Sequence, residues 1–172
     1  RKKYLKVSRQ YNQHDLISNS NDFDVYITGS DQVWNDKITN ADIVYSLGFE
    51  TKAKKVSYAA SAGSIQMISG QTLNNISKLD YISVREKDLQ EYLVGIVKKS
   101  VSLVVDPVFL LSKENWEKLL PKTNKKDKFI FTYSVSEMTE DVVKVARHIA
   151  RQNHTKIYHM DHSLKYGARG IC

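Results

Sequence analysis

Four short segments in this sequence carry side chains that could bind an anion or a sugar, and each follows an apolar run. Residues 28–35 read Thr-Gly-Ser-Asp-Gln-Val-Trp-Asn and supply hydroxyl, carboxylate and amide groups in succession. Residues 61–64 read Ser-Ala-Gly-Ser, and small residues let a ligand approach backbone N–H groups. Arg85-Glu86 and Asp106-Pro107 follow the next two apolar runs.

Each segment taken alone has an ordinary explanation. The first is typical of a turn with an Asx hydrogen bond, the second of a helix cap, the third of a solvated ion pair, and the fourth of a strand end. In a parallel α/β sheet, however, ligands bind beyond the carboxyl ends of the strands. Because all four segments would then meet at one edge, we predict a ligand crevice there.

The elements that would position these segments are alternating strands and helices. With only 7 Gly and 2 Pro, the chain has too few turn residues for an all-β fold. Apolar, β-branched and aromatic runs predict strands at residues 24–28, 55–59, 81–84, 102–105, 129–133 and 156–160. The segments between them predict helices, and the alternation predicts an α/β fold with a largely parallel sheet.

Helical spacing also predicts which side chains face the core. The first helix follows Gly70, the third is capped by Ser112, and the fourth starts near Thr139 with two acids in its first turn. The predicted inner residues are Leu73, Ile76 and Leu79; Leu89, Leu93 and Ile96; Trp116, Leu119 and Leu120; and Val142, Val145, Ala146 and Ile149.

A lysine-rich stretch divides the chain into two expected domains. Residues 121–128 contain four Lys and no strongly apolar residue, which is typical of a linker, although a solvated loop within one domain is the alternative. We therefore expect a first domain at 1–120, incomplete at its start, and a second at 129–172. The second part has only two predicted strands, so we expect it to be the beginning of a larger domain.

Composition narrows the class of protein. The chain has 172 residues, of which 41% are hydrophobic and 26% charged, and it carries a net charge of +7. That balance favours anionic partners but does not indicate a nucleic-acid binder, and the basic residues 1–9 are better explained as a solvated edge. No apolar run reaches the roughly 20 residues that span a bilayer. We expect a cytoplasmic protein with at most peripheral membrane association.

Other chemistry-bearing motifs are missing or weak. The sequence has no Gly-x-Gly-x-x-Gly, no P-loop and no Gly-x-Ser-x-Gly. Cys172 is the only cysteine, so an internal disulfide is excluded. His159 and His162 lie close together, but no further ligands stand at a recognisable spacing. We therefore expect neither a metal nor a cofactor.

Residues 22–35, Asp-Phe-Asp-Val-Tyr-Ile-Thr-Gly-Ser-Asp-Gln-Val-Trp-Asn, closely resemble a strand and loop of the polysaccharide pyruvyl transferase family. Three further segments fit in the same order: residues 55–63, residues 82–86, and residues 105–111 with Trp116. The resemblance is good over residues 22–120 and loose elsewhere. It implies two Rossmann-like domains similar to those of GT-B-like glycosyltransferases, with the second domain truncated.

The resemblance implies transfer of a pyruvyl group from phosphoenolpyruvate to sugar hydroxyls, which forms a ketal on a bacterial surface polysaccharide or its precursor. Phosphoenolpyruvate is then the donor substrate, and a sugar or lipid-linked oligosaccharide is the acceptor. The implied catalytic residues are Asp31, as base or acceptor ligand, and Arg85, as a cation for the donor. The implied substrate-binding residues are Gly29, Ser30, Gln32, Ser61, Gly63, Ser64 and Glu86.

The chain also departs from the family pattern. Nothing in residues 1–21 matches the usual first strand and loop, and the His-Gly element of the second half, which supplies cationic and acid-base groups, is missing. We therefore expect this chain alone to be inactive. A non-catalytic glycan-binding module on the same scaffold and a nucleotide-sugar glycosyltransferase are the two alternatives.

Overall fold

The computed structural model describes residues 10–120, 128–134, 138–160 and 169–171. The chain divides into two compact units, residues 1–119 and residues 120–172. The basic start at residues 1–9, nearly all of the expected linker, His162 and Cys172 lie outside the described residues. Each unit is described by itself below.

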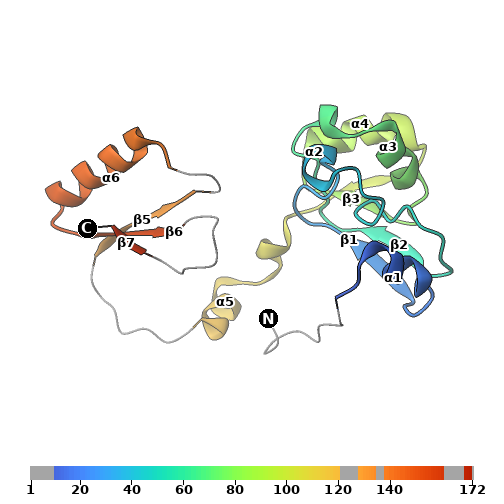
Figure 1. The fold of residues 1–172 in the computed structure, drawn as a ribbon, viewed down its shortest axis with the longest axis horizontal. Coiled ribbons are helices and arrows are strands. Elements are labelled where there is room, and N and C mark those ends of the chain that lie inside the picture. Colours follow the sequence, from blue (N-terminus) through green and yellow to red (C-terminus); the bar gives the residue numbers. More distant parts are fainter. Residues whose placement is uncertain (1–9, 121–127, 135–137, 161–168, 172) are drawn as a thin grey trace. The chain divides into compact units, whose positions relative to one another are not determined.

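Unit 1 alternates strands with helices, as predicted from the sequence (Figure 1). Its elements are α1 (Gln13–Ser18), β1 (Val25–Thr28), α2 (Asp36–Thr39), β2 (Lys54–Ser57), the 3₁₀ helix η1 (Ile65–Met67), α3 (Gly70–Ser77), β3 (Ile82–Val84), α4 (Lys87–Val97), β4 (Val101–Leu103), the 3₁₀ helix η2 (Pro107–Leu110) and α5 (Lys113–Leu119).

The four strands of unit 1 run parallel. β1 pairs with β2, where Ile27 lies opposite Val56, and β3 pairs with β4, where Ile82 lies opposite Val101. Single bridges, one of them between Val56 and Tyr81, link β2 to β3. The carboxyl ends of all four strands therefore lie at one edge, which confirms the predicted α/β class with small parallel sheets.

The core of unit 1 forms between the strands and the helices, of which Figure 1 shows α2, α3 and α4 close together. Trp34, Val84 and Leu93 are fully buried there. Leu79 is also buried, although α3 ends before it.

The predicted inner faces of α4 and α5 need correction, at one residue in α4 and throughout α5. In α4, Leu89, Leu93 and Val97 are buried, whereas Ile96 is exposed, because a spacing of four residues keeps side chains on one face. The short helix α5 has no buried residue, and Trp116, Leu119 and Leu120 are all exposed. Trp116 instead donates its indole N–H to the carbonyl of Val108, at 2.9 Å, so it lies against η2.

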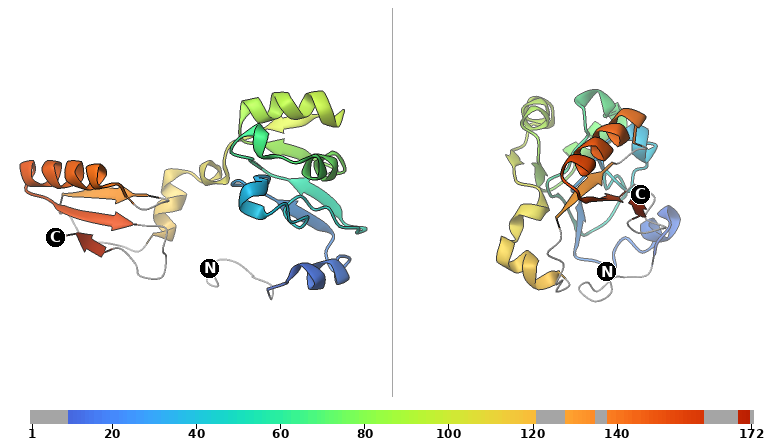
Figure 2. Two further views of the ribbon diagram at one scale, coloured as in Figure 1. Left: turned by 45° about the horizontal axis from the view of Figure 1, so that its top comes forward. Right: turned by 90° about the vertical axis from the view of Figure 1, so that its left-hand side faces the viewer.

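Unit 2 contains β5 (Phe129–Tyr133), α6 (Glu140–Gln152), β6 (Lys156–Met160) and β7 (Arg169–Ile171). β5 pairs parallel with β6, and α6 connects them (Figure 2). β7, which the sequence did not predict, pairs antiparallel with β6.

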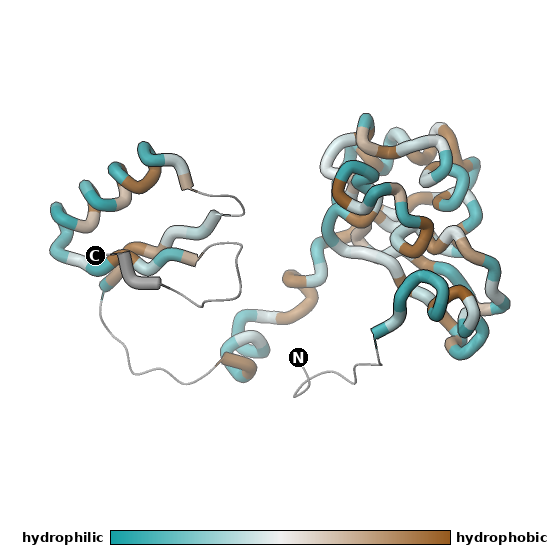
Figure 3. Tube along the Cα trace, in the orientation of Figure 1, coloured by the Kyte–Doolittle hydropathy of each residue, from teal (hydrophilic) through white to brown (hydrophobic). Residues whose placement is uncertain are grey.

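Helix α6 packs on its sheet through alanines. Ala146 and Ala150 are buried against Ile157 and Ile130, while the predicted inner residues Val142, Val145 and Ile149 are exposed. Small side chains allow the helix backbone to approach the strands closely, and the larger valines are then turned away. Figure 3 shows apolar stretches recurring along this helix beside polar ones. None of the helices in the described ranges is long and apolar enough to cross a membrane.

Candidate functional site

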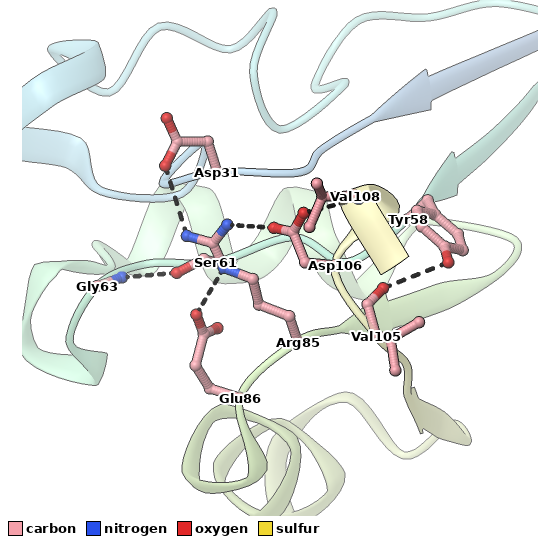
Figure 4. Close-up of polar contacts among 9 residues, drawn as sticks. All are labelled: Asp31, Tyr58, Ser61, Gly63, Arg85, Glu86, Val105, Asp106 and Val108. Atoms are coloured by element: carbon pink, nitrogen blue, oxygen red, sulfur yellow. Dashed lines mark hydrogen bonds and ion pairs between the residues drawn. The ribbon is translucent and has the colours of Figure 1, made fainter. Parts of the chain in front are cut away.

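The guanidinium of Arg85 joins three carboxylates at the carboxyl edge of unit 1 (Figure 4). Its Nε donates to Glu86 at 2.8 Å, Nη1 donates to Asp106 at 2.9 Å, and Nη2 donates to Asp31 at 3.4 Å. Arg85 and Glu86 follow β3, while Asp31 follows β1 and Asp106 follows β4. Three of the four segments singled out in the sequence therefore meet at one side chain.

The fourth segment is tied to the loop after β1 by its backbone. The carbonyl of Asp31 accepts the N–H of Ser61 at 3.0 Å, and the carbonyl of Ser61 accepts the N–H of Trp34 at 3.0 Å. Gly29 has φ +116°, and a side chain there would meet the carbonyl oxygen of Tyr58. Only glycine fits this close approach, so the residue type fixes how the loop leaves the strand.

Ser61 and Gln32 have internal partners in the structure. Ser61 is fully buried and its hydroxyl accepts the N–H of Gly63 at 3.0 Å. The Gln32 side-chain oxygen accepts from the Asn35 amide at 2.7 Å, and the same side chain lies against Gly63, whose φ is +69°. These two predicted substrate-binding residues shape the loop that presents their neighbours.

A small hollow lies between the loop after β2 and the start of α4. It is lined by residues 62–65 together with Glu86, Asp88 and Leu89, and its volume is about 10 Å³. Oε2 of Glu86 is buried and has no hydrogen-bond partner among the described residues. A space of this size holds about one water or one hydroxyl group. The hollow therefore has room for one such group beside the lining residue Glu86.

The remaining predicted residues lie at the rim of this edge. Ser64 borders the hollow, and its hydroxyl donates to the Gln66 side chain. Ser30 is half-buried between Gly29 and Asp31. The Tyr58 hydroxyl, which the sequence did not single out, donates to the carbonyl of Val105 at 3.3 Å (Figure 4).

Asp106 was not predicted as a site residue, although the segment that contains it was. Its Oδ1 accepts the N–H of Val108 at 3.1 Å and caps η2, while Oδ2 accepts from Arg85. The Val108 N–H and, next, the Arg85 guanidinium hold the pKa of Asp106 below its ordinary value. The hydrogen bond to Glu86, followed by the hydrogen bond to Asp106 and the nearby negative charges, raises the pKa of Arg85 against the opposing effect of burial. The signal in the sequence was an Asp-Pro pair directly after a strand, where Asp caps and Pro starts a helical turn.

The site offers charge and hydrogen-bonding groups but no metal-ligand set. Within residues 10–120 and the described parts of unit 2, no group of three or more His, Cys, Asp or Glu could hold a metal ion. His159, in unit 2, lies with Nδ1 at 3.1 Å from the hydroxyl of Thr132. The chemical groups at this edge of unit 1 are a guanidinium, which can pair with an anion, and carboxylates, which can accept a hydrogen bond from a hydroxyl.

Comparison with known proteins gives one match. The family model described as polysaccharide pyruvyl transferase covers residues 1–168. The match thus extends beyond residues 22–120, and it includes the start of the chain that was expected to depart from the family pattern. The chain matches none of the curated proteins and none of the solved structures with which it was compared. Members of this family are transferases that act on polysaccharides. Because the match spans nearly the whole chain, this protein belongs to the polysaccharide pyruvyl transferase family.

Proposed function

We propose that the protein takes part in transferring the pyruvyl group of phosphoenolpyruvate to two hydroxyls of a sugar, which forms a pyruvate ketal on a bacterial surface polysaccharide or its precursor. The observation that supports this most directly is the cluster at the carboxyl edge, where one guanidinium and three carboxylates meet in a chain of this family. A two-domain GT-B-like architecture and a cytoplasmic location, where phosphoenolpyruvate is available, are parts of the same proposal.

The donor needs cationic and N–H groups, since phosphoenolpyruvate carries a phosphate and a carboxylate. Arg85 offers a guanidinium, which suits both groups because its N–H donors form a planar fork. The backbone N–H groups of Ala62 and Ser64 have no partner among the described residues and lie in the loop beside it. They support a role for this loop in holding the donor.

The acceptor needs carboxylate partners for its hydroxyls. Glu86 is one of the residues that line the hollow, and the carboxylate of Asp31 is exposed to solvent. A carboxylate that accepts a hydrogen bond from a hydroxyl can also take its proton when the oxygen attacks. We assign this role to Asp31, and we assign Glu86 to positioning of the acceptor.

In the proposed transfer, each bond that forms is matched by a bond that breaks. The two acceptor oxygens each form a bond to the carbon that carried the phosphate, and that carbon loses its bond to the phosphate oxygen and its π bond to the methylene carbon. One hydroxyl proton ends on the methylene carbon, which becomes a methyl group, and the other leaves with inorganic phosphate. The transfer requires no oxidant or reductant, and phosphoenolpyruvate acts as a substrate, with no additional cofactor proposed.

The test is acceptor-dependent release of phosphate from phosphoenolpyruvate by the full-length protein, combined with mass spectrometry of the acceptor. We expect Arg85→Ala to abolish release, and Lys113→Ala to leave it unchanged, because Lys113 is an exposed cation on α5. Arg85→Lys keeps the positive charge but cannot donate to all three carboxylates as the guanidinium does. Comparing it with Arg85→Ala shows whether the charge itself, rather than correct folding, accounts for the lost release. Unchanged turnover by Arg85→Ala would reject the assigned role.

The same assay separates the two alternatives. A glycan-binding module would bind the sugar without consuming phosphoenolpyruvate. A nucleotide-sugar glycosyltransferase would release a uridine nucleotide instead of phosphate. Either result, obtained with a folded protein and a range of acceptors, would replace the proposed reaction.

A further inference from the structure

The three carboxylates hold Arg85 unequally. Glu86 and Asp106 accept at 2.8 and 2.9 Å, and their side chains are 36% and 31% exposed. Asp31 accepts at 3.4 Å and its side chain is 88% exposed. A contact at that distance is near the limit of a hydrogen bond, and an exposed ion pair of this kind contributes little. The Asp31 contact is therefore the weakest of the three.

The side chains also differ in what else holds them. Asp106 caps η2 through the N–H of Val108, so moving it would uncap that turn. Glu86 lies directly before α4, and its side chain is half-buried. The carboxylate of Asp31 has Arg85 as its one partner among the described residues.

The backbone of Asp31 is fixed even though its side chain is not. Its carbonyl accepts the N–H groups of Val33 and Ser61, at 2.9 and 3.0 Å. Its φ of +53° lies in the left-handed region, which Asp and Asn tolerate better than most residues. The side chain can thus rotate away from Arg85 without any change in the loop.

Charge decides where an anion can reach the guanidinium. One guanidinium against three carboxylates leaves two negative charges in excess, so an anion approaches only where a carboxylate withdraws. We propose that Asp31 is a displaceable ligand of Arg85, and that the anionic donor takes its place on Nη2. This inference rests on the proposed function for the identity of the donor, but not for the exchange itself.

The exchange also sets an order of binding. While Asp31 is paired with Arg85, its carboxylate competes with the donor and is not free for the acceptor. Once the donor occupies Nη2, the released carboxylate is available to a sugar hydroxyl. Donor binding should therefore strengthen acceptor binding, and by linkage the acceptor should strengthen donor binding to the same degree.

The experiment measures binding of inorganic phosphate, and separately of phosphoenolpyruvate, by titration calorimetry at low ionic strength. Asp31→Asn removes the competing charge and keeps a residue suited to the left-handed backbone. We expect it to bind phosphate at least about threefold more tightly than the wild type, the scale of losing one exposed competing ion pair.

The matched control is Glu91→Gln, which removes the same charge from the exposed face of α4, where Glu91 pairs with Lys87. It should change phosphate affinity less than twofold. The exchange is overturned if Asp31→Asn binds phosphate no more tightly than the wild type or Glu91→Gln, or if neither the wild type nor Asp31→Asn binds it at millimolar concentration.

Failure of the exchange and failure of the proposed function give different results. Tighter phosphate binding by Asp31→Asn without any pyruvyl transfer by the wild type would support the exchange and reject the function. Pyruvyl transfer by the wild type with unchanged phosphate affinity in Asp31→Asn would support the proposed function and reject the exchange.

Discussion

Replacing Gly63, in the loop after β2, by alanine should destabilise unit 1. The backbone at Gly63 has φ +69°, and a Cβ there would collide with the side chain of Gln32. The left-handed conformation costs an alanine about 1 to 2 kcal/mol. If Gln32 moves to relieve the collision, its hydrogen bond with Asn35 is lost, at about 1 kcal/mol. We expect a total loss of about 2 to 3 kcal/mol.

Urea unfolding followed by tryptophan fluorescence measures this loss, because both tryptophans, Trp34 and Trp116, lie in unit 1. The matched control is Gly95→Ala. Gly95 lies inside α4, where an added Cβ meets no atom, so alanine should stabilise the helix by about 0.5 to 1 kcal/mol.

A double variant separates the two contributions to the Gly63 loss. In a Gln32→Ala background the collision is absent, so Gly63→Ala should cost only the backbone contribution of about 1 to 2 kcal/mol. Equal stabilities of Gly63→Ala and Gly95→Ala would show that neither the backbone conformation at Gly63 nor its contact with Gln32 affects the stability of unit 1.

Two further predictions test the core and the charge cluster. Leu93→Ala should cost about 2 to 5 kcal/mol while Ile96→Ala costs less than about 1 kcal/mol, because only Leu93 is buried; equal losses in urea unfolding would place the α4 core face elsewhere. The lowered pKa of Asp106 means that its contribution to stability is present above pH of about 4 and is lost as pH falls through its folded-state value. Asp106→Asn, which weakens the links to Val108 and Arg85, should therefore flatten the loss of stability as the pH falls below about 4, and an unchanged slope there would contradict the assignment.

Strand positions and the convergence of the site segments could be predicted from the sequence. Runs such as residues 129–133 are apolar and β-branched or aromatic over the length of a strand, and β5 has the predicted bounds. By contrast, β2 and β4 each begin one residue earlier and end two residues earlier than predicted. Parallel pairing then brings strand ends to one edge, so contact between Arg85 and Asp31, 54 residues apart, followed from topology. β7 could not be predicted, because its three residues have no apolar pattern of their own.

Helix faces were harder, since hydrophobicity alone favours the larger side chain. In α6 the sequence pattern ranks Val142 and Val145 above Ala150, but the helix packs through its alanines because they allow a closer approach. The internal roles of Ser61 and Gln32 depend on backbone conformation at Gly63, which a residue type permits but does not specify. Asp106 was missed as a partner of Arg85 for a similar reason. The register of β4 against β3 brings the two residues together, and the sequence does not specify that register.

The charge balance at the carboxyl edge sets a further requirement on the proposed reaction. The described residues of this edge bring one guanidinium to three carboxylates, and release of Asp31 still leaves Glu86 and Asp106 on Arg85. A donor with a phosphate and a carboxylate brings at least two more negative charges, which a single shared cation does not neutralise. By this charge count, a donor of this kind needs cationic groups in addition to Arg85. The donor affinity of this edge should therefore be weak and strongly dependent on salt, and Asp31→Asn should raise it most at low ionic strength, where screening is least.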